Sequence, residues 1–337
     1  MTDIMLIGEA WGEYEARQRR AFVGPTGHLL NNMLTEAGIH RADCYATNVF
    51  NIKPPGNKIE SFCGPREHGI HGYPSLLPGR YVSRIYQPEL VRLSKELDNV
   101  NPNVVVCLGN TACWAMLGKT RIGKLRGIVQ YSTHTVADYK VLPTYHPAAI
   151  FRQWGLRAVT VIDLMKAKRE SEYRGIRRPK RHIWIEPTLE DIHEFDRRYI
   201  QPCERLSVDI ETYGKTITCI GFAPTSNLAI VVPFADIRKP GKNYWADHSS
   251  YVQAIDIVRT ILQRPTPKIF QNGLYDITFI WRAWGVKVRN AMHDTMLLHH
   301  ALQPELLKSL EFLGSVYSDE GPWKQMRKRK TTIKRDD

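Results

Sequence analysis

The sequence predicts an α/β protein of two domains, the first built on a mostly parallel sheet and the second on a mixed sheet. Three observations lead to this prediction. The chain has 337 residues, 43% hydrophobic and 24% charged, which is enough for two domains that each bury a core. In the first half, short apolar runs alternate with helical patterns. In the second half, several strand-like runs follow one another closely before the helices begin.

In the first half, the expected strands and helices alternate along the chain. Strands are expected at residues 4–7, 44–50, 103–109 and 141–145, and helices at 27–34, 88–97, 111–117 and 148–167. The Pro- and Gly-rich stretch at 53–79 is expected to be irregular. Alternation of this kind is typical of parallel strands whose connecting helices cover both faces of the sheet. The first half should therefore be a three-layer α/β/α sandwich.

The second half and the domain boundaries follow from pattern and charge. Strands are expected at 183–185, 206–210, 216–222, 228–233 and 268–271, and helices at 251–262 and 274–284. Lys and Arg are dense between residues 166 and 182, and again near the C-terminus. We therefore expect domains at 1–168 and 183–323, a basic linker at 169–182 and a basic tail at 324–337.

The charge of the chain points to a polyanionic partner. Lys and Arg total 47 against 34 Asp and Glu, a formal net charge of +13 and a pI near 9.5. A balance of this kind favours nucleic acid, although a solvated basic surface is the plain alternative. The six cysteines form no CxxC pair and do not look like a disulfide framework. With no signal peptide or membrane span expected, we predict a cytoplasmic protein, in the host cytoplasm if it is viral.

The first half contains four short motifs in order. They are Gly8-Glu9-Ala10-Trp11-Gly12-Glu13 followed by Ala21 to Gly27, Thr47-Asn48-Val49, Leu108-Gly109-Asn110 leading to Ile122 through Gly127, and Tyr145-His146-Pro147 with Arg152 just after. The first is a glycine-rich turn between a strand and a helix, as in phosphate-binding loops. It lacks Gly-Lys-Ser/Thr and Gly-x-Gly-x-x-Gly, and the Glu9 carboxylate would repel phosphate.

This set of motifs, over about residues 4–167, resembles the uracil-DNA glycosylase superfamily, especially its family 4 enzymes. The resemblance implies a pocket for a base flipped out of DNA. Phe22 would stack on the base, and the Asn48 amide would match the donor and acceptor on the edge of uracil. His146 would donate to the base O2 as negative charge develops there, and Glu9 would position a water or stabilise the cationic sugar. Each residue also has a plain structural interpretation: Glu9 as a helix-dipole partner, Phe22 as a core residue, Asn48 as a turn residue and His146 as a loop histidine.

The same resemblance implies DNA contacts and raises the question of a cofactor. Lys124, Arg126 and Arg152 are expected to bind DNA. Family 4 enzymes hold an iron–sulfur cluster with four cysteines, two of them ahead of the first motif. Here nothing but Met1 to Ile4 precedes Met5, and Ile52 lies close to where another ligand is expected. We therefore predict no iron–sulfur cluster, and the glycosylase chemistry needs no cofactor.

Carboxylates in the second half are spaced for a metal site. Asp209 and Glu211 lie two apart at the end of an expected strand and so point to one face. Asn272 and Asp276 lie four apart at the start of an expected helix and share a face. Three convergent carboxylates can hold two Mg²⁺ or Mn²⁺ ions that activate a water and stabilise the leaving oxygen. A surface strand end is the plain alternative for the first pair.

The order of these motifs, followed by His293-Asp294-Thr295, resembles the proofreading 3′–5′ exonuclease domain of family A DNA polymerases, with a ribonuclease H-like fold. By that resemblance Asp209, Glu211 and Asp276 are metal ligands and Asn272 binds substrate. Asp294 matches a helix start, where capping is expected rather than catalysis. The family's later Tyr-x-x-x-Asp motif is not found, so the exonuclease site looks incomplete: either it only binds DNA, or a DNA polymerase chain carrying that motif completes it.

The combination resembles proteins of bacterial viruses and favours one function over its rivals. It predicts a DNA glycosylase that excises uracil or a related modified pyrimidine, linked by its second domain to replication or repair. The first alternative is a non-catalytic DNA-binding or polymerase-accessory module that recognises such a base. The second is a split polymerase/exonuclease subunit completed by another chain. A hydrolase of small nucleotides fits less well, because the linker and tail are so basic.

Overall fold

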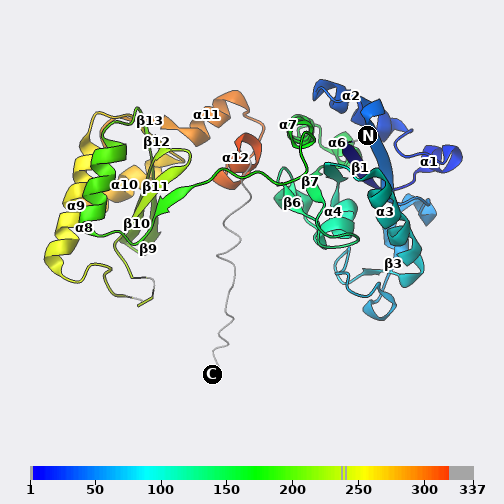
Figure 1. The fold of residues 1–337 in the computed structure, drawn as a ribbon, viewed down its shortest axis with the longest axis horizontal. Helices are drawn as coiled ribbons and strands as arrows, with labels where there is room; N and C mark the ends of the chain where they lie inside the picture. The colour runs from blue at the N-terminus through cyan, green and yellow to red at the C-terminus, as the bar shows by residue number, and fades with distance from the viewer. Residues whose placement is uncertain (1–2, 237, 240, 319–337) are drawn as a thin grey trace. The chain divides into compact units, whose positions relative to one another are not determined.

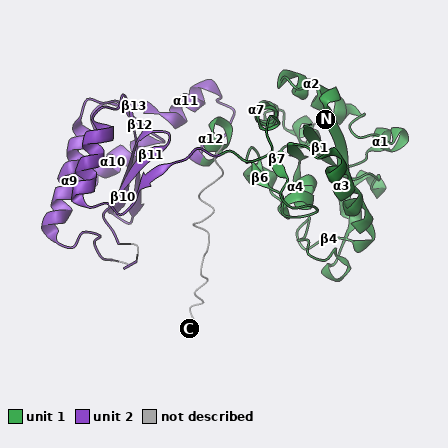
Figure 2. Cartoon of the chain, in the orientation of Figure 1, with its two compact units in different colours: residues 1–177, 311–337 green, residues 178–310 purple. Residues whose placement is uncertain are grey.

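The computed structural model describes residues 3–236, 238–239 and 241–318, which form two compact units (Figures 1 and 2). Unit 1 contains the described residues up to Arg177 and again from Glu311 onward, and unit 2 contains those from Arg178 to Leu310. The basic tail expected at 324–337 lies outside the described residues. Within the described part of the chain, no helix is long and apolar enough to cross a membrane.

Unit 1 is built on a five-stranded sheet in the order β2-β1-β5-β7-β6, parallel except for β6. Its strands are β1 (Ile4–Ala10), β2 (Cys44–Phe50), β5 (Val104–Leu108), β6 (Gln130–Tyr131) and β7 (Lys140–Thr144), with a small separate pair, β3 (Cys63–Gly64) and β4 (Tyr81–Val82). Its helices are α1 (Glu13–Gln18), α2 (Pro25–Glu36), α3 (Gln87–Val100), α4 (Asn110–Leu117), α5 (Ile122–Leu125), α6 (Pro147–Arg152), α7 (Leu156–Glu170) and α12 (Leu310–Tyr317).

Alternating side chains of β1 divide the core of unit 1 into two layers. Met5 and Ile7 pack with the apolar residues of α3 and α4, whereas Ile4 and Leu6 pack with those of α2 and α7. Successive residues of a strand point to opposite faces, so each face of the sheet has its own helical layer (Figure 1). The three-layer α/β/α sandwich expected from the sequence is confirmed.

Unit 2 is built on a six-stranded mixed sheet in the order β13-β12-β9-β10-β11-β8. Its strands are β8 (His182–Trp184), β9 (Leu206–Tyr213), β10 (Thr216–Thr225), β11 (Leu228–Pro233), β12 (Lys268–Phe270) and β13 (Ala291–Asp294), and its helices are α8 (Leu189–Phe195), α9 (His248–Gln263), α10 (Gly273–Trp284) and α11 (Thr295–Leu302). Strands β9, β10 and β11 form an antiparallel meander, while β12 runs parallel to β9 and β13 parallel to β12. This is the mixed, ribonuclease H-like α/β sheet that the sequence predicts.

The boundaries of the units differ from the expected domains at two places. Helix α12 lies within the range 183–323 expected for the second domain, yet it belongs to unit 1, against which its side chains and carbonyls are bonded. The first part of the expected linker is also packed on unit 1. The buried ammonium of Lys140 donates to the carbonyls of Glu170 and Tyr173, which fixes the chain just after α7. Buried lysines need acceptors, and here the chain following α7 supplies them.

Candidate functional site

A cavity of about 330 Å³ opens at one edge of the unit 1 sheet. Glu9 and Asn48 lie near the ends of β1 and β2, and His146 follows the end of β7. Because the carboxyl ends of parallel strands meet at one edge, these residues converge although they are far apart in sequence. Four sequence-predicted residues line this one cavity: Glu9, Phe22, Asn48 and His146.

Glu9 is held by a hydrogen bond from the start of helix α4. The hydroxyl of Thr111 donates to the Glu9 carboxylate, with 2.5 Å between Oγ1 and Oε2. Burial raises the pKa of Glu9 above its ordinary value, because the charged form loses water. The Thr111 hydrogen bond lowers this pKa in part, and the charges of Glu60 and Arg152 act in opposite directions. The result is a carboxylate that takes up a proton more readily than one in water.

Asn48 and Phe22 lie against the first strand at a glycine. A Cβ atom at Gly8 would lie 2.2 Å from the Asn48 Oδ1 and 2.6 Å from the Phe22 Cζ, so no larger residue leaves room for both. Asn48 is 3% exposed, and its amide faces this crowded wall. Phe22 is 7% exposed and belongs both to the core and to the cavity wall, which unites the two interpretations that the sequence left open.

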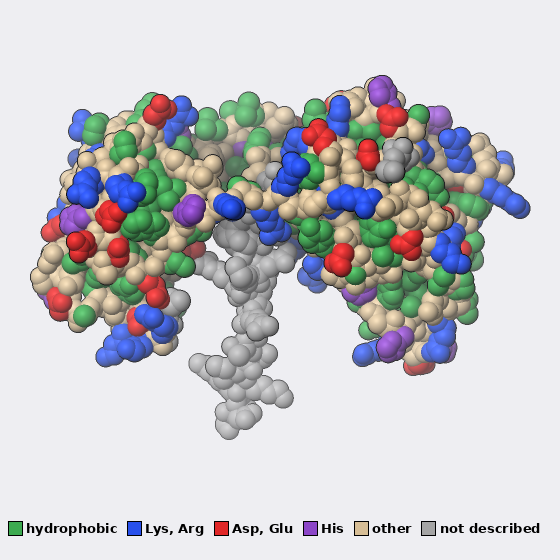
Figure 3. All heavy atoms as spheres, viewed as in Figure 1, with side chains coloured by type: hydrophobic (Ala, Val, Ile, Leu, Met, Phe, Trp, Pro, Cys, Tyr) green, Lys and Arg blue, Asp and Glu red, His purple; other side chains and the backbone are tan. Residues whose placement is uncertain are grey.

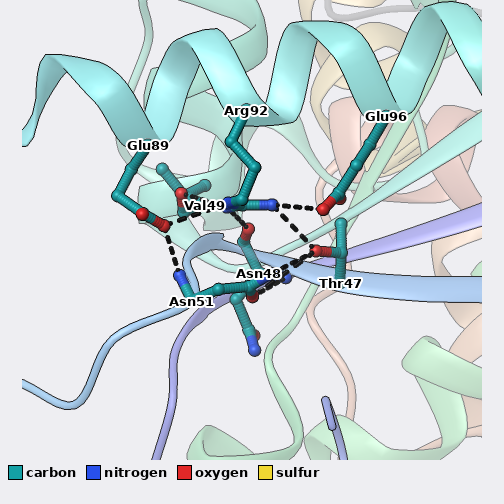
Figure 4. A network of polar contacts seen from close by, with 7 residues as sticks. All are labelled: Thr47, Asn48, Val49, Asn51, Glu89, Arg92 and Glu96. Atoms are coloured by element: carbon teal, nitrogen blue, oxygen red, sulfur yellow. Dashed lines mark hydrogen bonds and ion pairs between the residues drawn. The ribbon is translucent and has the colours of Figure 1, made fainter. Parts of the chain in front are cut away.

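The backbone of Asn48 is anchored by helix α3. The Arg92 guanidinium donates through Nη2 to the carbonyls of Asn48 and Val49, at 2.8 and 2.9 Å. Its other nitrogens pair with Glu89 at 3.1 Å and Glu96 at 2.7 Å, which hold the guanidinium in place. Figure 4 shows the whole network: Thr47, Asn48, Val49, Asn51, Glu89, Arg92 and Glu96. An ion-paired arginine thus fixes the backbone that carries the Asn48 amide.

His146 is the N-cap of helix α6, and this fixes which ring nitrogen carries the proton. Its Nδ1 accepts a hydrogen bond from the backbone N–H of Ala148 at 3.1 Å. Burial lowers the pKa of His146 to about 4, and the positive charge of Arg152 acts in the same direction. The ring is therefore neutral near pH 7, with its proton on Nε2. Its centroid lies 6.1 Å from that of Phe22, at an interplanar angle of 35°.

The three basic residues expected to bind DNA have different surroundings. Arg152 is exposed on α6, close enough to the cavity for its charge to lower the pKa of both Glu9 and His146. Lys124 is also exposed. The expectation for Arg126 is wrong: it is 2% exposed and forms an ion pair with Asp163, which is fully buried. A guanidinium enclosed in this way cannot reach a phosphate.

Other basic side chains remain at the surface of both units. Figure 3 shows Lys and Arg side chains spread over the visible face of each unit rather than confined to one of them. Lys166, by contrast, is 2% exposed and donates to backbone carbonyls, so this part of the basic stretch is structural. The positive charge that a polyanion would meet therefore comes from only part of the chain's Lys and Arg.

Sequence patterns missed three residues that position the site. The buried Glu15 accepts hydrogen bonds from the backbone of Val23 and Gly24, at 3.2 and 3.0 Å, and so holds the loop that carries Phe22. Thr111 follows the motif at Leu108 to Asn110 directly, which was the available signal. Arg92 lies three and four residues from Glu89 and Glu96, a spacing that indicates only a helix-surface ion pair.

The described cysteines do not fit a four-cysteine iron–sulfur cluster. Cys63, Cys107 and Cys113 are buried in the core layer of α3 and α4, whereas Cys44 belongs to the layer on the other face of the sheet. Among the described residues, no group of three or more His, Cys, Asp or Glu side chains is arranged to hold a metal ion. No cluster enters the chemistry derived for this cavity.

The metal ligands expected in unit 2 stay a prediction, and among the described residues no group of three or more His, Cys, Asp or Glu side chains is arranged to hold a metal ion. Asp209 is exposed and Glu211 half-buried, while Val208 and Ile210 point into the core, so the two carboxylates share a face as expected. The Asp276 carboxylate accepts a hydrogen bond at 3.1 Å from the backbone N–H of Ile210, the residue between these two acids. Burial raises the pKa of Asp276 to about 6, and the negative charge of Asp209 adds to this.

The structure confirms one expectation in unit 2 and leaves another untested. Asp294 is the N-cap of α11, where its carboxylate accepts hydrogen bonds from the backbone N–H groups of Met296 and Leu297. It also accepts from the backbone of Asn272 and Gly273, which joins the starts of α11 and α10. Asn272 itself is exposed, and its role in binding substrate stays a prediction.

Comparison with known proteins agrees with the geometry of unit 1. Residues 1–168 match the uracil DNA glycosylase superfamily. The type-4 uracil-DNA glycosylase of Thermotoga maritima is 33% identical over 171 residues, which cover 50% of this chain and 77% of that protein. The DNA polymerase of Bacillus phage SP01 is 22% identical over 325 residues, which cover 88% of this chain and 32% of the polymerase.

Solved structures also resemble part of the chain. Brucella melitensis NrnC is 15% identical over 42% of this chain and 63% of its own, less than two thirds of its length, with a TM-score of 0.29. A likeness at that score does not bear on function. The match over residues 1–168 and the 33% identity to a relative covered over 77% of its length agree with the cavity residues. Through its first unit, the chain belongs to the uracil DNA glycosylase superfamily.

Proposed function

We propose that unit 1 hydrolyses the bond between the sugar and a uracil, or a related modified pyrimidine, in DNA. The observation that supports this most is the convergence of Glu9, Phe22, Asn48 and His146 on one cavity. The type-4 uracil-DNA glycosylases similar to this chain support the same substrate class. A base inside a duplex is out of reach of such a cavity, so the target nucleotide has to be flipped out of the stack.

Base recognition and leaving-group stabilisation follow from the cavity wall. The ring of Phe22 offers a stacking face, and the Asn48 amide offers one donor and one acceptor to the edge of the pyrimidine. As the bond from C1′ to N1 breaks, its electron pair moves onto the base. The Nε2–H of the neutral His146 donates a hydrogen bond to the base oxygen where this negative charge accumulates.

Glu9 provides the other half of the reaction. The water oxygen forms a bond to C1′ as the base departs, and the water proton passes to the Glu9 carboxylate. The raised pKa of Glu9 brings it closer to the pH at which the reaction runs, which favours a general base. In this mechanism His146, which follows β7, holds the leaving base, and Glu9, near the end of β1, activates the water.

The surface next to His146 has the composition of a DNA-binding surface. Helix α6 and the turn after it expose Phe151 and Trp154, at 57% and 62%, on either side of the Arg152 and Gln153 pair. Exposed aromatic rings can stack on bases, and Arg152 can bind a phosphate. We assign Arg152, Lys124 and the two aromatic rings to contacts with the strand that carries the flipped base.

Unit 2 links this activity to DNA replication or repair. The similarity to a phage DNA polymerase spans both units, which supports a role near such machinery. A polymerase chain that completes the exonuclease-like unit, the viral origin and the cytoplasmic location all stay predictions. No exonuclease step is proposed, and the roles of Asp209, Glu211 and Asp276 as metal ligands stay predictions.

A glycosylase assay without metal tests the proposal. The protein is incubated with an end-labelled oligonucleotide containing one uracil, in EDTA, and the product is treated with hot alkali. We expect strand cleavage at the uracil, lost in His146→Ala and Asn48→Ala. Asn99→Ala, an exposed asparagine on α3, is the matched control and should cleave normally.

The alternatives give different results in the same assay. Binding of the uracil oligonucleotide by the folded wild-type protein without cleavage would favour the non-catalytic module that recognises a base. Digestion from the 3′ end on adding Mg²⁺ or Mn²⁺ would show that unit 2 has metal-dependent exonuclease activity. Absence of both binding and cleavage with any uracil-containing DNA would rule out the proposed activity.

A further inference from the structure

Helix α12 follows unit 2 in the chain but is bonded to the interior of unit 1. Two cations of unit 1, Arg126 and Lys166, are each only 2% exposed and face α12. A buried cation is stable only when its donors are satisfied. The partners of these two cations therefore show what α12 contributes to unit 1.

Arg126 connects α12 to the strand that leads to His146. It forms an ion pair with Asp163 of α7 through two nitrogens, and its third nitrogen donates to the Ser315 hydroxyl of α12 at 2.7 Å. Asp163 also accepts a hydrogen bond from the Thr144 hydroxyl at 2.7 Å. Thr144 is the last residue of β7, two residues before His146. A single buried chain of bonds thus runs from α12 to the end of the strand that positions His146.

Lys166 completes the attachment at the C-terminal end of α12. Its ammonium donates to the carbonyls of Gly127, Ser315 and Ser318, at 3.0, 3.1 and 2.8 Å. The carbonyls at the end of a helix have no partner within the helix, and a cation placed there satisfies them. Of these acceptors, the carbonyls of Ser315 and Ser318 come from the α12 segment. Without α12, this buried ammonium would lose both.

The backbone of α12 also approaches the turn after α5 closely. A Cβ atom at Gly127 would lie 2.9 Å from the Ser315 carbonyl oxygen and 2.9 Å from the Asp163 carboxylate. Gly127 has a φ of 72°, which L residues with side chains seldom adopt. Leu313 and Val316 are 5% and 9% exposed, so α12 also buries apolar surface. Gly127 and the two cations of unit 1 thus accommodate α12, and the helix buries its own apolar side chains.

We propose that α12 is an integral part of the glycosylase unit, which holds the end of β7 and so positions His146, and that unit 2 is an insertion within this unit. By chain order, Arg178 to Leu310 then separates α7 from the helix that completes the buried network. The motif from Ile122 to Gly127 serves as the seat of α12, with Arg126 as a positioning residue. The effect of α12 on catalysis through His146 rests on the proposed function. The assignment of α12 to the fold of unit 1 does not.

The test uses the full chain and three variants. Val316→Asp places a charge in the buried face of α12, Ser315→Ala removes the hydroxyl that Arg126 bonds, and Leu307→Asp is a matched control at a position that is 67% exposed. Amide hydrogen exchange is measured at residues 122–129 and 140–146, together with kcat and KM on the uracil oligonucleotide. Folding of each variant is checked by amide hydrogen exchange at residues 206–233 of unit 2.

We expect Val316→Asp to speed exchange in both segments and to lower kcat about tenfold with KM little changed, because His146 is misplaced while the rest of the cavity persists. Ser315→Ala should do the same to a smaller degree, and Leu307→Asp should do neither. Unchanged exchange at 122–129 and 140–146 in Ser315→Ala and in a folded Val316→Asp would overturn the proposal. If Val316→Asp fails to fold, amide exchange in Ser315→Ala tests the proposal. If the wild-type chain has no glycosylase activity, the proposed function is wrong, and the role of α12 is then tested by amide exchange alone.

Discussion

The two residues of the cavity to which we assign catalytic roles have pKa values displaced in opposite directions. Burial raises the pKa of Glu9 and lowers that of His146 to about 4. Burial disfavours the charged form of any group, so an acid gains a proton and an imidazolium loses one. One environment therefore gives a readily protonated carboxylate and a neutral hydrogen-bond donor, which are the two roles that glycosidic bond hydrolysis requires.

The acid limb of the pH–rate profile should follow Glu9. The Glu9 carboxylate is the active form, and activity falls as the pH falls through its pKa. Thr111→Val removes the hydrogen bond that lowers this pKa, so the pKa rises further and the acid limb of kcat/KM should move to higher pH. Thr111→Ser keeps the hydroxyl and should retain the wild-type profile. An acid limb that stays in place in Thr111→Val would remove Thr111 from any role in tuning Glu9.

Among the elements, helix α3 shows how a structural segment serves a site that it does not line. Its apolar face, with Leu90, Leu93 and Leu97, packs into the core, which fixes the position of the helix. Arg92 on its flank is thereby held where its guanidinium reaches the carbonyls at the end of β2. Packing of the apolar face of α3 therefore places Arg92, which in turn positions the backbone of Asn48.

Loss of the Arg92 side chain should therefore disturb both stability and base recognition. Arg92→Ala leaves two strand carbonyls and two partly buried carboxylates without their partner, and we expect it to lower the free energy of unfolding by about 2 kcal/mol. KM for the uracil oligonucleotide should rise more than kcat falls. Lys95→Ala, an exposed cation on the same helix, is the control. Denaturant unfolding and steady-state kinetics measure both effects, and identical behaviour of the two variants would contradict the assignment.

For the whole molecule, net charge is the property that bears most directly on its partner. A formal charge of +13 favours nucleic acid, but the buried Arg126, Lys140 and Lys166 are bound to groups within unit 1 and are not available to DNA. Charge counted from the sequence therefore overstates the charge that a phosphate backbone meets. Affinity for DNA depends on the exposed cations, each of which displaces counterions when it binds a phosphate.

The salt dependence of DNA binding should separate exposed from buried cations. A plot of log affinity against log salt should have a negative slope, and Arg152→Gln should make the slope less steep by about 1. Arg259→Gln, a change at an exposed arginine of unit 2, is the control for loss of one charge. Fluorescence anisotropy with a labelled uracil oligonucleotide between 50 and 200 mM salt, roughly the range where such slopes are measured, gives both values. Equal slopes for Arg152→Gln and wild type would place Arg152 away from the DNA.

Features of this protein that depend on local pattern could be predicted from the sequence. The alternation of expected strands and helices along the chain predicted the layers of unit 1, and the ordered motifs, through the family that they resemble, predicted a cavity shared by Glu9, Phe22, Asn48 and His146. Asp294 as a helix cap was equally accessible, because capping involves residues only a few positions apart. These predictions succeeded because the order of motifs along the chain and the spacing of nearby residues can be seen in the sequence.

Contacts between polar groups that are far apart in the chain could not be predicted and became visible in the folded protein. Arg126 looked like a DNA contact, yet it is enclosed by Asp163 and by Ser315, which lies 189 residues away in the chain. Three other hydrogen bonds also join residues far apart in the chain. Thr111 donates to Glu9, Arg92 donates to the carbonyl of Asn48, and the backbone N–H of Ile210 donates to Asp276. Spacing along the chain sets the face of a helix or strand on which a side chain lies. The packing of distant elements decides which groups that side chain contacts.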